Sequence, residues 1–324
     1  MEITTPSDLK TILHSKRANL YYLEHCRVLV NAGRVEYVTD EGKRSLYWNI
    51  PIANTTSILL GTGTSITQAA ARELAKAGVL VGFCGGGGTP LFSATERDTD
   101  ILWFSPQSEY RPTEYLQAWA RFWFDDEQRF EAARQIQRWR LEQIRQHWTS
   151  RPLRDREFIV DSARLDSLLE QAKIHIDHAS DVNDLLTGEA RLTKQLFKLA
   201  VDTTHYGDFT RAKRGTGTDP ANRFLDHGNY LAYGMSAVAC WVLGLPHGLA
   251  VLHGKTRRGG LVFDAADLIK DALIMPQAFI SAMAGHEENE FRQACIETLT
   301  QAEALDFIID RLKDIAQQQG VAGL

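Results

Sequence analysis

The sequence lacks the features of a secreted or membrane-spanning protein. It has four cysteines among 324 residues, and no two form a C-x-x-C pair, which argues against zinc knuckles and a disulfide framework. Nowhere do about 18 uncharged apolar residues run together, so we expect no membrane span. The start, Met-Glu-Ile-Thr-Thr-Pro, has neither the basic residues nor the apolar core of a signal peptide. These absences predict a cytoplasmic protein with buried, reduced thiols.

A complete nucleotide-binding motif is also missing. Gly61-Thr-Gly63-Thr-Ser65 has only two of the three glycines of G-x-G-x-x-G, and no P-loop Lys-Ser/Thr follows it. The glycine run Gly85–Gly88 is not followed by a helical pattern that could bind phosphate at its N-terminus. We interpret both as structural turns. A nucleotide-dependent metabolic enzyme, which NAD or ATP would stabilise thermally, is therefore the weakest of three functional hypotheses.

The composition is that of a soluble globular protein, with 44% hydrophobic and 24% charged residues. The net charge of −5 argues weakly against nucleic-acid binding, but the charges are unevenly distributed. Residues 191–258 hold ten Lys or Arg and four Asp or Glu, whereas residues 259–324 hold four and eleven. A basic stripe can concentrate polyanions on an acidic protein, although such blocks are more often plain solvated faces.

The chain has two regions with different sequence patterns. The first ninety-odd residues are rich in β-branched residues and turn signals, and the helix expected within them has Ser65 or Thr64 as N-cap and Gly78 at its end. The expected strands are 26–30, 34–39, 45–52, 58–60 and 79–83, and that helix is 66–77. After Pro106, amphipathic helical periods predominate. They predict a helix or helix pair over 113–148 and helices over 161–175, 184–201, 219–243, 265–284 and 287–316.

The sequence therefore predicts an α+β protein. A small β-rich N-terminal domain, residues 1–100, is followed by a larger all-α domain, residues 101–324. The polar, proline-containing connection between them falls near residues 95–110.

The segment from His253 to Asp267 places an imidazole and two carboxylates around three cations, with Glu189 upstream. Carboxylate oxygens with an imidazole nitrogen suit Mg²⁺ or Mn²⁺, and neighbouring cations suit phosphate. If a helix begins near Asp264, then Asp264, Asp267 and Asp271 share one face. The plain alternative is that Asp264 is a helix N-cap followed by acids that favour the helix dipole.

Cations that could bind a phosphodiester backbone occur in two stretches. One is the glycine-rich loop from Arg211 to Arg223, and the other directly follows His253. The candidate DNA-binding residues are Lys213, Arg214, Arg223, Lys255, Arg257 and Arg258. A solvated surface loop is an equal alternative for the first stretch. His247, between Pro246 and Gly248, is more typical of a helix end than of a ligand.

Three long segments carry a resemblance to a known family: Leu9–Tyr22, Asp219–Tyr230 and His253–Gly260. With the order Glu…His…Asp-x-x-Asp, they closely resemble the CRISPR-associated adaptation integrases and endonucleases, the Cas1 family, and most of all its type I-F branch. The resemblance covers nearly the whole chain. The chain departs from the wider family pattern after Asp267, where Leu268-Ile-Lys270-Asp271 replaces a Phe-Arg-Pro run.

The resemblance implies specific roles and partners. Glu189, His253 and Asp267 match the metal ligands, and Asp264 matches a further active-site aspartate. It also implies a helical catalytic domain, a homodimer assembled through the β-rich domains, and double-stranded DNA substrates, namely a captured fragment and a CRISPR repeat. In the type I-F branch the protein partner is the small adaptation adaptor fused to the interference helicase-nuclease.

The leading hypothesis is a metal-dependent DNA endonuclease and integrase that inserts captured foreign DNA as new spacers. In this reaction a 3′-hydroxyl attacks a repeat phosphodiester, and Mg²⁺ or Mn²⁺ assists. The alternative from another class is a non-catalytic DNA-binding scaffold, in which the acids only cap helices and the cations only clamp phosphate.

Overall fold

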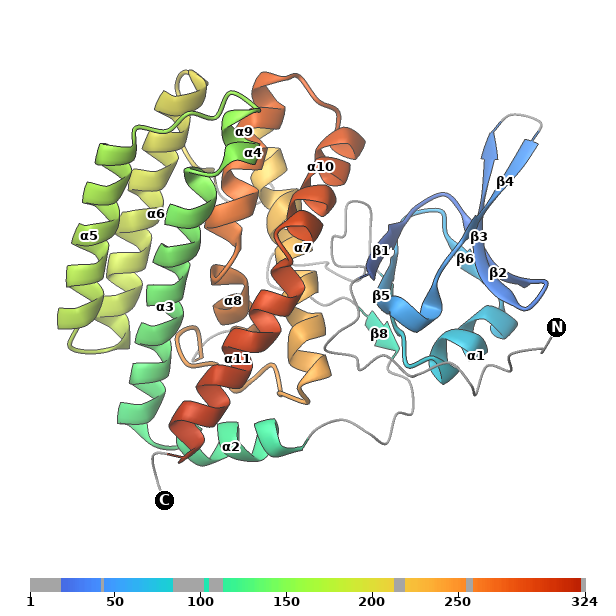
Figure 1. Ribbon diagram of the computed structural model, residues 1–324, viewed down its shortest axis with the longest axis horizontal. Helices are drawn as coiled ribbons and strands as arrows, with labels where there is room; N and C mark the ends of the chain where they lie inside the picture. Colours follow the sequence, from blue (N-terminus) through green and yellow to red (C-terminus); the bar gives the residue numbers. More distant parts are fainter. Residues whose placement is uncertain are drawn as a thin grey trace. The chain divides into compact units, whose positions relative to one another are not determined.

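The computed structural model describes residues 19–41, 44–83, 102–104, 113–212, 219–254 and 259–321. The chain divides into two compact units, residues 1–110 and 111–324. The first is built mainly of strands and the second of helices (Figure 1), which confirms the predicted fold class. Strand β8 (Leu102–Phe104) pairs with a strand of the first unit, although the helical domain was predicted to start at residue 101.

The described residues of the amino-terminal unit form two four-stranded sheets, with strand orders β1-β5-β7-β8 and β4-β3-β2-β6. Parallel pairing joins β1 to β5 and β5 to β7, and antiparallel pairing joins β2, β3 and β4. A tight turn joins β2 to β3, between the strands expected over 26–30 and 34–39, and both Ala32 and Gly33 adopt positive φ in it. The strands are β1 Asn19–Leu23, β2 Arg27–Asn31, β3 Arg34–Glu41, β4 Arg44–Asn49, β5 Thr55–Leu60, β6 Ser65–Ile66 and β7 Leu80–Phe83.

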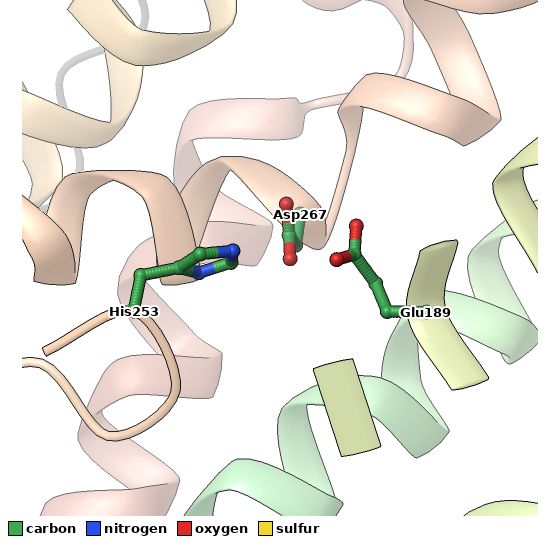
Figure 2. A group of neighbouring side chains, drawn as sticks. All are labelled: Glu189, His253 and Asp267. Carbon is green, nitrogen blue, oxygen red and sulfur yellow. The ribbon is translucent and has the colours of Figure 1, made fainter. Parts of the chain in front are cut away.

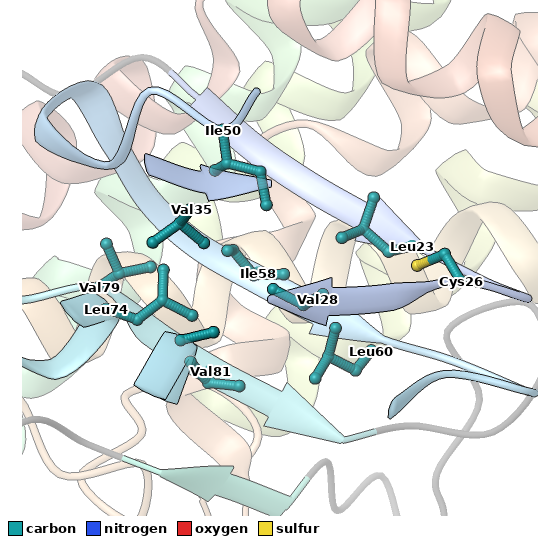
Figure 3. Packing of buried hydrophobic residues seen from close by; sticks show 11 residues of the cluster. Leu23, Cys26, Val28, Val35, Ile50, Ile58, Leu60, Leu74, Val79 and Val81 are labelled. Atoms are coloured by element: carbon teal, nitrogen blue, oxygen red, sulfur yellow. The ribbon is translucent and has the colours of Figure 1, made fainter. Parts of the chain in front are cut away.

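The core of this unit is apolar. Aliphatic side chains from β2, β3, β5 and β7 pack against Leu74 of helix α1 (Gln68–Lys76), as Figure 3 shows. Ile58, Val28 and Leu74 have no exposed surface. The β-branched pattern that predicted the strands therefore supplies the packing as well.

The N-cap predicted for helix α1 was wrong. Thr67 caps the helix, and its hydroxyl accepts a hydrogen bond from Ala70 N at 3.2 Å. Thr64 instead donates to the Gly61 carbonyl, while Ser65 enters β6 and pairs with β2. Parallel pairing with β2 thus delays the helix by two residues.

The helical unit is arranged around helix α7, most of which is buried. Helices α8, α9, α10 and α11 all pack against α7, and α3, α5 and α6 lie side by side (Figure 1). Its helices are α2 Glu114–Trp123, α3 Asp126–Trp148, α4 Arg151–Arg154, α5 Ser162–His178, α6 Val182–Thr204, α7 Pro220–Val242, α8 Gly260–Asp267, α9 Met275–Met283, α10 Glu288–Gln301 and α11 Ala304–Val321.

Several predicted helices are divided in the structure. The 113–148 stretch is the helix pair α2 and α3, separated where Asp125 caps α3. The 287–316 stretch breaks into α10 and α11 at Glu303, whose φ is positive. The single helix predicted over 265–284 was wrong: α8 ends at Asp267, and a π-helical turn (Lys270–Ile274), here called the π turn, precedes α9.

Two expectations from composition can be compared with the structure. Cys26, Cys240 and Cys295 are free and buried, and burial raises the pKa of the Cys26 thiol to about 11. Cys84 lies outside the described residues. Within the part of the chain that the structure describes, none of the helices is long and apolar enough to cross a membrane.

Candidate metal centre

Three side chains from distant parts of the chain converge in the helical unit. Glu189 projects from the middle of α6, His253 from the turn that follows α7, and Asp267 from the last residue of α8. Each offers a ligand atom, and these atoms lie within 4.8 Å of one another (Figure 2). The Asp267 side chain is fully buried, whereas the Glu189 and His253 side chains are 14% and 17% exposed. The site is therefore recessed but open to solvent on one side.

Asp264 orients the His253 ring. Its Oδ1 contacts His253 Nδ1 at 2.8 Å and accepts a hydrogen bond from the His253 backbone N at 3.0 Å. Its Oδ2 accepts from the backbone N atoms of Val251 and Leu252 at 2.7 and 3.1 Å. A carboxylate whose oxygens are both engaged in this way fixes an imidazole, and it leaves Nε2 as the ring nitrogen for a metal ion.

The electrostatic environment of His253 follows from this arrangement. Burial lowers the pKa of the His253 ring, but the hydrogen bond to Asp264 and the negative charges of Asp267 and Asp264 outweigh burial, so the pKa is raised.

The alternative interpretation of Asp264 as a helix N-cap was wrong. Helix α8 begins at Gly260, so Asp264 lies within the helix and is fully buried. A Cβ atom on Gly260 would lie 2.6 Å from Ala250 Cβ and 3.0 Å from the His253 carbonyl oxygen. Glycine therefore lets the first turn of α8 approach the segment that carries His253.

Helix α3 supplies a cation to the cluster. Arg140 has a 1% exposed side chain, and its Nε donates to Asp271 Oδ2 at 2.8 Å while the same oxygen also contacts its terminal nitrogen. The guanidinium also donates to Gln137 Oε1 at 2.9 Å and Thr193 Oγ1 at 2.7 Å. One terminal nitrogen lies 3.6 Å from Glu189 Oε1. Arg140 is thus tied to α3, α6 and the π turn at once.

The π turn places Asp271 against α3 rather than beside Asp264 and Asp267. Met275 N donates to the Lys270 carbonyl, five residues earlier, and Trp148 Nε1 of α3 donates to the Asp271 carbonyl at 2.9 Å. The single acidic face predicted for Asp264, Asp267 and Asp271 is therefore wrong. Wide turns of this kind are frequent at functional sites.

Lys270 is the second cation of the cluster. Its Nζ lies 2.5 Å from Asp267 Oδ1 and 3.7 Å from Glu189 Oε1. Burial lowers the pKa of Lys270, but the charges of Asp267 and Glu189 outweigh burial and raise it. In Asp267, burial raises the pKa, but the charges of Lys270, His253 and Arg140 outweigh it and lower the pKa. Both side chains therefore stay charged at neutral pH.

The donor set fits a divalent cation. Metal–ligand distances of about 2.0–2.6 Å allow two ligands of one ion to lie up to about 5 Å apart, and the observed spread of 4.8 Å is within that limit. Two carboxylates and one imidazole suit Mg²⁺ or Mn²⁺. Glu189, His253 and Asp267 could therefore hold one ion, while Asp264 acts on His253.

Most of the predicted DNA-binding cations lie outside the described residues: Lys213, Arg214, Lys255, Arg257 and Arg258. Arg223 is described, and it lies exposed in the first turn of α7. Described residues near each of these stretches make hydrogen bonds of their own. Arg211 donates to Asn222 Oδ1 at 2.7 Å and contacts Asp226, and Leu261 N donates to the His247 carbonyl at 2.9 Å. The DNA-binding role of all six residues stays a prediction.

Sequence reasoning missed Gln137, Arg140 and Lys270. The sequence does hold a signal for the first two. Arg140 shares the buried face of α3 with Ile136 and Ile144. A charged side chain on a buried face requires a polar or charged partner. Lys270 had no comparable signal, since its position depends on the π turn.

The Gly61–Ser65 turn packs closely against side chains of its own unit. A Cβ on Gly61 would lie 2.6 Å from the Tyr22 hydroxyl, and one on Gly63 would lie 2.5 Å from His25 Nδ1. Side chains of the same unit thus fill the space beside both glycines, in agreement with the structural interpretation.

Comparisons with known proteins agree on one family. The family model described as CRISPR associated protein Cas1 matches residues 20–283. The chain is 70% identical over 323 residues to a CRISPR-associated endonuclease Cas1 of Pseudomonas aeruginosa, covering 99% of this chain and 100% of that protein. It is 65% identical over 315 residues to a protein of the same name from Pectobacterium atrosepticum, covering 97% of each.

Solved structures share the fold at low sequence identity. A crystal structure of a TtCas1–DNA complex matches with a TM-score of 0.66 and 22% identity, over 92% of this chain and 91% of that chain. A casposase bound to an integration product matches with a TM-score of 0.68 and 13% identity, over the same shares.

Proposed function

Because the chain belongs to the CRISPR-associated Cas1 family, we propose that it is a metal-dependent DNA endonuclease and integrase. It joins the 3′-hydroxyl of a captured foreign DNA fragment to a phosphodiester of a CRISPR repeat and so inserts a new spacer. The curated relatives at 70% and 65% identity, both named endonucleases, support the DNA-cleaving part of this proposal. The shared fold with a casposase bound to an integration product is consistent with the joining part.

The observation that carries the proposal is the convergence of Glu189, His253 and Asp267 on one point, with Asp264 holding the His253 ring. These residues come from α6, a turn and α8, and ordinary helix capping does not require them to meet. A histidine fixed by a buried carboxylate is the usual supporting arrangement of a metal ligand.

The reaction exchanges one P–O bond for another and needs no oxidant or reductant. The 3′ oxygen of the fragment forms a P–O bond as the P–O bond to the 3′ oxygen of the repeat strand breaks. The attacking hydroxyl loses its proton to solvent, and the departing 3′ oxygen takes up a proton to become a new 3′-hydroxyl. Attack by water at the same phosphorus gives cleavage, and the reverse attack releases a fragment from branched DNA. A bound Mg²⁺ or Mn²⁺ would polarise the phosphodiester and lower the pKa of the attacking hydroxyl.

The residues of the chain position the reacting groups. Asp264 keeps His253 Nδ1 engaged, so the ring cannot rotate freely. Arg140 and Lys270 offset the repulsion among the carboxylates. Arg223, with Lys213, Arg214, Lys255, Arg257 and Arg258, neutralises backbone phosphates without reading bases.

The partners are part of the same proposal. A homodimer forms through the amino-terminal units, and the aromatic side chains of Tyr47 and Trp48, 57% and 49% exposed on edge strand β4, support this. The type I-F resemblance supports a further partner, the adaptation adaptor fused to the interference helicase-nuclease. The DNA substrates are double-stranded.

The test uses branched DNA and fragments with free 3′-hydroxyls, with Mn²⁺ or EDTA. We expect joined and released products from the wild type with Mn²⁺, none with EDTA, and none from His253→Ala or Asp267→Ala, while DNA binding persists. Asp202→Ala is the matched control, because Asp202 lies on α6 with a 55% exposed side chain and pairs with Arg164 outside the site. Full activity in both site variants with metal present would contradict the assignment.

A non-catalytic DNA-binding scaffold is the second candidate. One observation favours it: Asp267, Glu189 and Asp271 all have cationic partners within the protein, as in a purely structural ion-pair network. A scaffold binds DNA equally with EDTA or Mn²⁺ and yields no joined product under any condition, so the same experiment separates the two.

A further inference from the structure

Lys270 occupies an unusual place among the candidate metal ligands. Its Nζ contacts Asp267 Oδ1 at 2.5 Å and lies 3.7 Å from Glu189 Oε1, so one ammonium group bridges the two carboxylates. Its side chain is only 18% exposed, and it comes from the π turn directly after α8. Asp267 and Lys270 are therefore fixed relative to one another by the same short stretch of backbone.

The formal charges of the buried cluster leave two negative charges. Among the described residues, the cluster joins four carboxylates, those of Glu189, Asp264, Asp267 and Asp271, to two cations, Arg140 and Lys270, through ion pairs and through His253. A metal-binding histidine is neutral. One divalent cation brings this cluster to neutrality. Neutrality is favoured because unbalanced charge in a recessed site is costly. A second divalent ion would leave a net charge of plus two before DNA binds.

The position of the Lys270 ammonium group also favours a single ion. In sites with two metal ions, the ions lie about 3.5–4 Å apart and share bridging carboxylates. Here the ammonium of Lys270 already contacts one of the two carboxylates and lies within 4 Å of the other. It thus takes the contacts that a second ion would need.

We propose that Lys270 is a resident counter-ion of the metal centre, which holds Glu189 and Asp267 together in the metal-free protein and limits the site to one divalent ion. This proposal rests on the proposed function only in taking these residues as metal ligands. Lys270 competes electrostatically with the metal ion, and Arg140, held by Asp271 and Thr193, supplies the second fixed positive charge.

The test measures Mn²⁺ binding and thermal unfolding of the full chain without DNA. We expect the wild type to bind one Mn²⁺ per chain. Lys270→Met, which keeps the length of the side chain but removes its charge, should bind Mn²⁺ about tenfold more tightly. Without metal it should unfold at a lower temperature, and Mn²⁺ should raise that temperature by more than in the wild type. Lys270→Arg should keep the wild-type affinity.

Lys173→Met is the matched control, because Lys173 has a 56% exposed side chain on α5 and pairs with Asp177 at 3.5 Å, away from the site. It should change neither measurement. Lys270→Gln, which is neutral but polar, repeats the measurement if the methionine variant does not fold.

Two Mn²⁺ ions per wild-type chain, or unchanged or weaker Mn²⁺ binding in the neutral variants, would overturn the role of Lys270 while leaving the integrase proposal in place. A wild-type chain that binds no Mn²⁺ at all would instead overturn the metal centre itself, and the inference with it.

Discussion

The two units of the chain differ in what they bury. Among the described residues of the amino-terminal unit, the buried polar side chains are Thr55, Thr56 and Ser57, and none is charged. The helical unit buries charged side chains in its interior: Arg140, Asp264, Asp267, Asp271 and Arg292. Most of these charges surround the candidate metal centre, and buried charges are costly unless they are paired.

This difference implies that the two units restrict substitutions of their buried residues in different ways. An apolar core tolerates substitutions that keep size and shape, so the core of the first unit serves stability. In the helical unit a charged side chain is tied to partners on two or three elements, as Arg140 is to α3, α6 and the π turn. Removing such a side chain should therefore affect the site as well as the fold.

The largest expected effect is the loss of a ligand charge. Glu189→Gln keeps the size of the side chain but removes its charge, and we expect DNA joining to fall about a thousandfold or more, since metal assistance contributes several kcal/mol. Joining assays with Mn²⁺, with circular dichroism as the check on folding, measure this. Near wild-type joining by the folded variant would show that the buried charges of the helical unit do not serve the chemistry.

A large loss of stability is expected for Arg140→Met. The change leaves Asp271 buried without its cation, and breaking a buried pair costs about 3–5 kcal/mol of unfolding free energy. Urea unfolding of the metal-free protein measures it. The double variant Arg140→Met with Asp271→Leu should recover part of the loss, and a single variant as stable as the wild type would contradict the account.

The sequence predicted the parts of this comparison that depend on local patterns. Alternating β-branched residues identified the strands around Val28 and Ile58, and helical periods identified α3, α5, α6 and α7. The resemblance indicated Glu189, His253 and Asp267, whose ligand atoms lie within 4.8 Å of one another in the structure. Their approach requires tertiary packing of α6 against α9 and of α8 against α7, which periodicity does not encode.

The sequence did not predict the support around the site. Asp264 has the sequence signature of an N-cap, yet Gly260 lets α8 start one turn earlier and turns Asp264 toward His253. The π turn depends on hydrogen bonds from Arg140 and Trp148, residues more than 120 positions away. Long-range partners thus decided these local geometries.

A smaller effect is expected for Asp264→Asn. An amide cannot accept from all the donors that Asp264 satisfies, so His253 loses its fixed orientation. Mutation of such an outer partner lowers metal affinity by about 10–100-fold. Calorimetric titration with Mn²⁺ measures the change, and an unchanged affinity would show that Asp264 serves the fold alone.

The smallest effect is expected in the amino-terminal core. Ile58→Val removes one methylene from a side chain with no exposed surface and should cost about 1 kcal/mol of unfolding free energy. Mn²⁺ affinity should stay at the wild-type value. If the affinity also fell, the separation between a core for stability and a core for chemistry would not hold.

The most direct test of the central claim is an anomalous diffraction map from crystals of the protein soaked in Mn²⁺. The account predicts one strong peak in the helical unit, within about 2.0–2.6 Å of a Glu189 oxygen, His253 Nε2 and an Asp267 oxygen. No peak at these residues in a soaked crystal, or a peak held by other side chains, would contradict it.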